Sequence, residues 1–279
     1  MNHNIKSFAK INLALNVVGK NPTLHKIETI IAFIDLYDLI KIKLSNSNKH
    51  NITFHGKFSK NIGSSNTISK LLNILEKKKL IKNKKFNINI KKQIPHMSGL
   101  GGGSMNAASI LRFFVKKKII KATQKELKII ASLIGSDVIL GLNPVNSILT
   151  QKNEIKYLKK CEKLNVLVVK PNFGCSSKDI YSKVKKFNKP QISNLKKNIF
   201  NLVNLRKLSN SLEIIALKKY PRLRKIKLYL ENLSPDFVRL TGSGSALVAY
   251  FQSKERCEIA RKQFNKKYKN YWCIASKTI

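Results

Sequence analysis

The segment at residues 95–108, which reads PHMSGLGGGSMNAA, constrains this chain more than any other stretch. Four of the chain's twelve glycines fall within its positions 99–103. Before it, Phe86, Ile88 and Ile90 alternate with polar residues, as on a strand with one buried face. After it, apolar residues from Ala107 to Phe114 follow helical spacing. The sequence therefore predicts a strand, a glycine loop and a helix in immediate succession.

A glycine loop at a helix start predicts an anion site. Glycine lets the backbone adopt positive φ and approach a ligand closely. The first N–H groups of a helix lack partners within the helix, and its dipole is positive at that end, so phosphate is the natural occupant. A plain flexible turn is the alternative. No lysine follows the glycines as in a P-loop, and Ser104 stands where a dinucleotide fingerprint needs glycine.

Two further stretches accompany this loop. Residues 8–13 read FAKINL, and residues 241–246 read TGSGSA between two strand patterns. Apolar residues at 11, 13, 15 and 17 alternate with polar ones, which places Lys10 and Asn12 together on the opposite face of a strand. Strands and helices are mixed along the chain without regular β-α-β alternation, so we expect the α+β class.

The three motifs, in this order and spacing, resemble those of the GHMP kinases. The loop has the variant form of the branch that serves the non-mevalonate isoprenoid pathway and takes a cytidine-diphosphate-linked polyol. The resemblance implies ATP-dependent phosphorylation of an alcohol. It also implies two domains, one at 1–150 with the topology of a ribosomal-protein domain and a ferredoxin-like one at 151–279. A family member acting on homoserine, a sugar or mevalonate is the alternative.

The same resemblance assigns residues to ATP. They are Pro95, Gly99, Leu100, Gly101, Gly102, Gly103, Ser104, Asn106, Asn66 and Lys92. Met105 replaces the small residue usual after the serine. We expect Mg²⁺ to accompany ATP, but the sequence predicts no set of metal ligands, and Ser104 offers the only nearby side-chain oxygen we can nominate.

Catalysis is assigned to Lys10 and Asp137. The resemblance places the catalytic aspartate in the segment Gly135-Ser136-Asp137-Val138, although Ile139 replaces the usual proline. Asp137 would accept the proton of the substrate hydroxyl. Lys10 would keep that carboxylate ionised and stabilise charge on the moving phosphoryl group. The alternatives are a helix cap for Asp137 and a solvated lysine for Lys10.

Substrate binding is assigned by the resemblance to Asn12, His25, Tyr181 and Gly242. His25 would contact the cytosine and Tyr181 would stack on it. Leu24 stands where the family has a tyrosine, and the loop is one residue short. An ordinary loop histidine and a core tyrosine are the alternatives for His25 and Tyr181.

Composition excludes several other classes. The formal charge is +41, yet lysines are spread along the whole chain and no aromatic residues interleave with them as in RNA-binding motifs, so no specific nucleic acid is expected. No apolar run reaches the length needed to cross a bilayer. The four cysteines and five histidines lack zinc spacing. We expect a cytoplasmic protein, monomeric or weakly dimeric, with no membrane partner.

Overall fold

The computed structural model describes residues 3–22, 24–158, 161–192 and 199–279. The chain forms two compact units, each assembled from separate stretches. Unit 1 comprises Met1–Ala9, Leu36–His96 and Gly101–Pro144, and unit 2 comprises Lys10–Asp35, Met97–Leu100 and Val145–Ile279. The glycine segment is therefore divided, with residues up to Leu100 in unit 2 and those from Gly101 in unit 1. The division at residue 150 stays a prediction.

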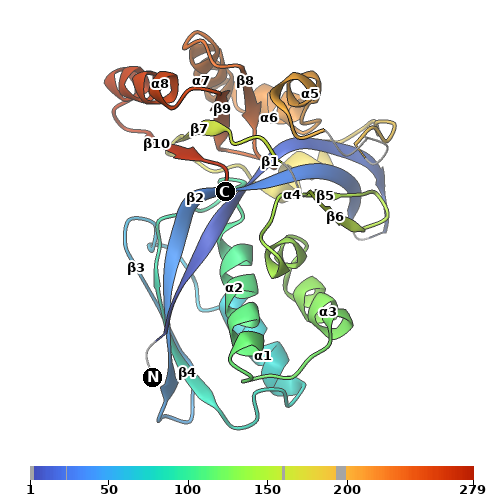
Figure 1. Ribbon diagram of the computed structural model, residues 1–279, viewed down its shortest axis with the longest axis vertical. Coiled ribbons are helices and arrows are strands. Elements are labelled where there is room, and N and C mark those ends of the chain that lie inside the picture. The colour runs from blue at the N-terminus through green and yellow to red at the C-terminus, as the bar shows by residue number, and fades with distance from the viewer. Residues whose placement is uncertain (1–2, 23, 159–160, 193–198) are drawn as a thin grey trace. The chain divides into compact units, whose positions relative to one another are not determined.

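Two long strands contribute to both units. They are β1 (His3–Lys20) and β2 (His25–Ser45), which pair with each other (Figure 1). The sequence predicts separate strands at 27–33 and 39–44, but the structure joins them in β2. Asp38 does not end the strand, because its buried carboxylate is paired with Lys92. A buried charge is tolerated only when it is paired and hydrogen-bonded.

Unit 1 packs helices against one face of a sheet (Figure 1). Strand β4 (Lys85–Lys91) pairs antiparallel with the end of β2 and parallel with β3 (Asn51–His55). Alternate residues of β2 and β4 are buried, among them Ile40, Ile42 and Phe86, and they join the apolar faces of the helices in one core. These helices are α1 (Thr67–Lys77), α2 (Gly102–Lys116) and α3 (Gln124–Ile134).

The ends of these helices follow their sequence signals. Thr123 and Glu126 form a capping box at the start of α3, as their spacing of three residues predicts. Asn66 caps α1, its Oδ1 accepting from the N–H groups of Ile68 and Ser69. A short 3₁₀ turn, η1 (Val138–Leu142), follows α3 and packs against α2.

Unit 2 is built on a four-stranded antiparallel sheet in the order β10-β7-β9-β8. Its strands are β7 (Asn165–Lys170), β8 (Phe237–Leu240), β9 (Leu247–Phe251) and β10 (Trp272–Lys277). Its helices are α4 (Ser177–Ser182), α5 (Leu202–Lys207), α6 (Glu213–Lys219), α7 (Pro221–Glu231) and α8 (Lys254–Lys267). Leu15 and Val17 of β1 lie in the same core.

The α+β class expected from the sequence is confirmed. The polar stretch 151–160 contains strand β6 (Ile155–Tyr157), which pairs with β5 (Ser147–Leu149). Residues 159 and 160 lie outside the described part of the chain. Within that part, every helix is too short or too polar to span a bilayer.

Candidate functional site

The start of helix α2 has the backbone geometry of an anion cradle. Its N-cap is Gly101, with φ of 72°, a left-handed conformation that suits glycine. Because Gly101 has no side chain, it cannot cap the N–H groups of the first turn. A Cβ atom on Gly102 would lie 2.9 Å from Cγ2 of Ile94. The carbonyl of Gly103 accepts a hydrogen bond of 2.7 Å from Oγ1 of Thr67. These features fit a phosphate group against the backbone.

A buried carboxylate joins three segments of unit 1 next to this helix start. Asp38 is fully buried, and its Oδ1 accepts from the backbone N–H groups of Gln93 and Ile94 at 2.7 and 2.9 Å. Its Oδ2 accepts from Nζ of Lys92 and, at 3.0 Å, from Nδ2 of Asn106. Two residues that the sequence assigns to ATP, Lys92 and Asn106, are therefore buried and held by one aspartate.

The turn that carries Asp137 packs on helix α2 within unit 1. Asp137 is the N-cap of η1, but its side chain makes no capping hydrogen bond there. The cap alternative for this carboxylate is therefore not supported. A Cβ on Gly141 of this turn would lie 2.6 Å from Cβ of Ala108 and 3.0 Å from Sδ of Met105. Met105, unusual for the family, is buried and occupies the space beside Gly141.

Lys10 and Asn12 lie side by side in unit 2, as the alternation predicts. Nζ of Lys10 donates to Oδ1 of Asn12 at 2.7 Å, and Lys10 is only 4% exposed. Nδ2 of Asn12 donates to Oγ1 of Thr29, and its backbone N–H donates to Oγ1 of Thr241 at 3.0 Å. The strand is buried on both faces here, so Lys10 is not a solvated lysine.

The two glycine loops meet in unit 2. The N–H groups of Ser245 and Ala246 donate to the carbonyls of Met97 and Ser98. Gly99 has φ of 77°, and a Cβ there would lie 2.0 Å from the carbonyl oxygen of Thr241. Strand β1 contacts both loops. The N–H of Lys10 donates to the carbonyl of Leu100, and a Cβ on Gly242 would lie 3.5 Å from Oδ1 of Asn12.

An aromatic cluster forms a separate part of unit 2. The ring of His25 lies 5.1 Å from that of Tyr181 and 6.4 Å from that of Phe187, measured between centroids. Burial, with a smaller contribution from Lys20, lowers the pKa of His25 below its ordinary value. His25 is therefore neutral at pH 7 and can both donate and accept a hydrogen bond.

The structure thus brings the predicted residues together in groups. One group is Lys10, Asn12, Gly99, Leu100 and Gly242 in unit 2, and a second is His25 with Tyr181. In unit 1, Lys92 and Asn106 share Asp38. Pro95 is buried between β4 and α2, Gly101 is the N-cap of α2, and the first turn of that helix contains Gly102, Gly103 and Ser104. Asp137 belongs to unit 1 and Lys10 to unit 2, and their pairing stays a prediction.

Asn66 has a structural role in addition to its predicted one. Its Oδ1 caps α1, while its Nδ2 donates to the carbonyls of Gly63 and Ser64. Both ends of its amide are therefore engaged by the protein. Its assignment to ATP remains a prediction.

Sequence reasoning missed several polar residues of these groups. Asp38 had a usable signal, because the two-residue period of β2 places it on the same face as Ile40 and Ile42. Thr29 and Thr241 had no such signal, since their partners are distant in the sequence. Phe187 lies in a stretch of lysines and asparagines without periodicity.

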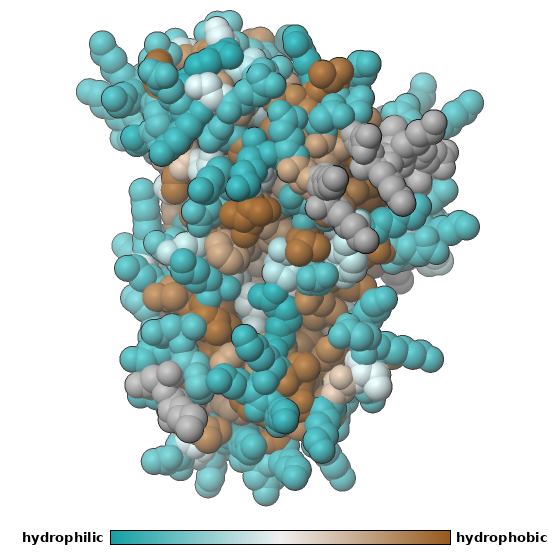
Figure 2. Space-filling view, in the orientation of Figure 1, coloured by the Kyte–Doolittle hydropathy of each residue, from teal (hydrophilic) through white to brown (hydrophobic). Residues whose placement is uncertain are grey.

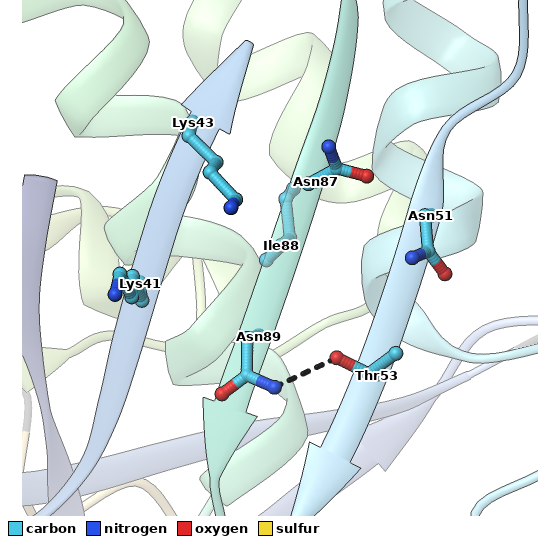
Figure 3. Close-up of a pocket in the computed structure, with 7 residues that line it drawn as sticks. All are labelled: Lys41, Lys43, Asn51, Thr53, Asn87, Ile88 and Asn89. Carbon is cyan, nitrogen blue, oxygen red and sulfur yellow. Dashed lines mark hydrogen bonds between the residues drawn. The ribbon is translucent and has the colours of Figure 1, made fainter. Parts of the chain in front are cut away.

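The hollow drawn in Figure 3 does not coincide with the predicted site. The open hollow in Figure 3 lies on the solvent-facing side of the unit 1 sheet, between side chains of β2, β4 and β3. Asn89 donates to Thr53 across two of these strands at 2.8 Å. None of the predicted site residues lines it. The visible face of the molecule is largely hydrophilic (Figure 2), in keeping with 55 lysines and arginines.

Across the described ranges, no three side chains of His, Cys, Asp or Glu are grouped so that they could hold a metal ion.

Comparison with known proteins agrees with these motifs. Residues 66–144 match the model of the GHMP kinases N terminal domain, and residues 184–270 match that of the GHMP kinases C terminal domain. A "4-diphosphocytidyl-2-C-methyl-D-erythritol kinase" of Pelagibacter ubique is 55% identical over 99% of this chain and 98% of its own length. A protein of the same name from Clostridium beijerinckii is 30% identical over 95% of this chain and 97% of its own length.

Solved structures show the same fold. A crystal structure of 4-(cytidine 5'-diphospho)-2C-methyl-D-erythritol kinase superposes with a TM-score of 0.78, covering 99% of this chain and 100% of that one at 20% identity. Homoserine kinase from Cytophaga hutchinsonii gives a TM-score of 0.73 at 16% identity, covering 99% and 94% of the two chains. At such low identity the superpositions establish the fold alone. The identity to the Pelagibacter protein over nearly the full length goes further, and the chain belongs to the 4-diphosphocytidyl-2-C-methyl-D-erythritol kinases of the GHMP kinase family.

Proposed function

We propose that this kinase transfers the γ-phosphoryl group of ATP to the 2-hydroxyl of 4-diphosphocytidyl-2-C-methyl-D-erythritol, a step of non-mevalonate isoprenoid precursor biosynthesis. The observation that carries this proposal is the 55% identity to the Pelagibacter kinase over almost the whole of both chains. The contacts within unit 2 of β1, residues 97–100 and the loop at 241–246 support it, because these segments carry the motifs that resemble the family.

The triphosphate is proposed to bind at the glycine loop. The N–H groups in the first turn of α2 are not capped by a side chain of Gly101, and they would donate hydrogen bonds to the phosphates. The hydroxyl of Ser104 would lie nearby. Mg²⁺ bound with ATP would neutralise charge on the β- and γ-phosphates. Such an ion would be held by phosphate oxygens of the nucleotide and by water.

Lys10 and Asp137 are proposed to act on the transferring group. Phosphoryl transfer needs positioning and charge compensation more than covalent help. A buried ammonium such as that of Lys10, fixed by Asn12, loses little freedom when the reaction begins. Asp137 would take the proton of the attacking hydroxyl.

The cytidine end of the substrate is proposed to bind at the aromatic cluster. His25 is neutral and can exchange hydrogen bonds with a base that has both donors and acceptors. Tyr181 provides a ring for stacking. The proposed partners are thus ATP and one cytidine-linked alcohol, and a cytoplasmic location stays a prediction.

A substrate panel tests the proposal. The purified protein is given ATP, Mg²⁺ and one of four alcohols: the diphosphocytidyl compound, homoserine, mevalonate or galactose. We expect ADP release with the cytidine compound alone. Turnover of another alcohol without turnover of the cytidine compound would move the chain to a different GHMP activity.

A further inference from the structure

The stretch 183–190, which reads KVKKFNKP, places one exposed ring among exposed lysines. Phe187 is 47% exposed although its ring is within contact distance of His25. Lys185, Lys186 and Lys189 around it are exposed as well. An aromatic face beside cationic side chains is the combination that binds a nucleotide, because the ring stacks on the base and the cations meet the phosphates.

A buried carboxylate fixes the position of this stretch. Glu28 is fully buried in β2, and its Oε1 accepts from the backbone N–H groups of Gln191 and Ile192 at 2.6 and 2.9 Å. The same oxygen accepts from Nδ2 of Asn16 at 3.2 Å. Charge-assisted hydrogen bonds of this kind are about twice as strong as neutral ones. The segment just after Phe187 is therefore anchored to β2 at Glu28, which follows His25 by three residues.

Asn188 ties the backbone next to Phe187 to β1. Its backbone N–H donates to the carbonyl of Val17 at 2.9 Å, and its Nδ2 donates to Oδ1 of Asn16 at 2.8 Å. Asn16 thus links Glu28 to the residue next to Phe187. An exposed aromatic side chain held on an anchored backbone loses little entropy when a flat ligand covers it.

We propose that Phe187 is a base-stacking residue for the cytidine of the substrate and that Glu28 is a positioning residue acting through it. This inference rests on the proposed function for the identity of the substrate. It also explains how the cytosine could be stacked although Leu24, which is 63% exposed, replaces the tyrosine of the family. Tyr181 stacks on one side of the cytosine, and Phe187, in the segment after α4, supplies the second aromatic ring in place of the residue before His25.

The first test measures binding of cytidine and of cytidine 5'-diphosphate by calorimetry, without turnover. Phe187→Ala should weaken both ligands by the same factor of about ten, which corresponds to about 1.4 kcal/mol. Phe187→Tyr should bind like the wild type. Val203→Ala, which shortens another exposed apolar side chain of unit 2, is the matched control and should change neither affinity.

Three outcomes would overturn the assignment of Phe187. They are wild-type affinity in Phe187→Ala, a loss confined to the diphosphate, and absence of cytidine binding by the wild type. Binding that depends on Phe187 in a protein that does not phosphorylate the cytidine alcohol would instead remove the proposed function and leave Phe187 as a residue that stacks on cytidine.

The role of Glu28 is tested by a double-variant cycle with Glu28→Gln, which keeps the shape but removes the charge. Glu28→Gln should raise KM for the cytidine substrate and leave KM for ATP unchanged. Combined with Phe187→Ala, it should add no further loss, because it acts through that ring. Additive losses, or equal effects on both KM values, would contradict a positioning role.

Discussion

Nζ of Lys10 lies 2.7 Å from Oδ1 of Asn12, and both side chains are buried in a strand that is closed to solvent on both faces. A lysine loses much of its hydration in such a place, and it is retained only where its charge has a use or a partner. The bond to Asn12 orients the ammonium, and Asn12 is itself held by Thr29 and Thr241.

Removing this charge should stop catalysis and leave the fold. Lys10→Met should lower kcat by about 10²–10³-fold, the usual loss when one preorganised charge-stabilising donor is removed. Lys41→Met, at an exposed lysine of β2, is the control and should keep full activity. Steady-state kinetics with thermal unfolding of both variants checks this, and near-normal kcat in Lys10→Met would exclude Lys10 from the mechanism.

Asp137→Asn should separate binding from chemistry. It removes the proposed proton acceptor but keeps the size of the side chain, so kcat should fall by about 10²–10⁴-fold. The dissociation constant of a non-hydrolysable ATP analogue should be unchanged. If ATP binding is lost and kcat per bound complex is kept, Asp137 supports the nucleotide and is not the base.

The Asp38–Lys92 pair should dominate the stability of unit 1. Asp38→Asn leaves a buried ammonium without its counter-charge, which costs about 3–5 kcal/mol in the free energy of unfolding. The double variant Asp38→Asn with Lys92→Met removes both charges and should recover most of that loss. Urea unfolding measures both values, and equal stability of the single and double variants would show that the unpaired ammonium is not the cause of the loss.

Gly99 is predicted to tolerate no side chain. Alanine there would need positive φ, which costs about 1–3 kcal/mol for a strained residue. It would also place Cβ 2.0 Å from the carbonyl oxygen of Thr241, so the two glycine loops must separate. Gly63→Ala is the matched control, because nothing lies within 4 Å of its Cβ position. A Gly99→Ala protein with wild-type stability and KM for ATP would contradict the packing.

Protonation of His25 should make stability and cytidine binding depend on pH only in the acidic range. Its pKa is lowered in the folded protein, so the unfolded chain takes up the proton first, and the stability it contributes is lost as pH falls below the ordinary histidine range. Cytidine binding should be constant at neutral and alkaline pH and weaken below that range. An NMR titration of the His25 ring, assigned with His25→Gln, checks this, and a pKa above the ordinary value would reverse the expected sign.

The sequence predicts those parts of the fold and site that depend on neighbouring residues. Alternation in β1 predicts that Lys10 and Asn12 share a face, and Thr123 with Glu126 predicts the cap of α3. The continuity of β2 could not be predicted in this way, because the burial of Asp38 depends on Lys92, 54 residues later. Phe187 is placed by Glu28 and Asn16, which are also remote in the sequence.

The division of the glycine segment between the two units could not be predicted from patterns of neighbouring residues either. Residues 97–100 belong with the loop at 241–245, since Gly99 packs on Thr241 and Ser245 donates to Met97. Such contacts join residues some 140 positions apart and carry no periodic pattern. Motif spacing therefore predicted which loops matter, but not that the two glycine loops touch.

The position of the transferred phosphoryl group tests the central claim most directly. The 2-carbon of 4-diphosphocytidyl-2-C-methyl-D-erythritol carries a methyl group and no hydrogen. A phosphomonoester on its oxygen should give a proton-coupled ³¹P signal without three-bond coupling to hydrogen. We expect this singlet in a reaction of the wild-type protein with ATP, and its formation about 10²–10³-fold more slowly with Lys10→Met. A triplet or doublet, which marks a primary or secondary alcohol, or no new phosphomonoester at all, would contradict it.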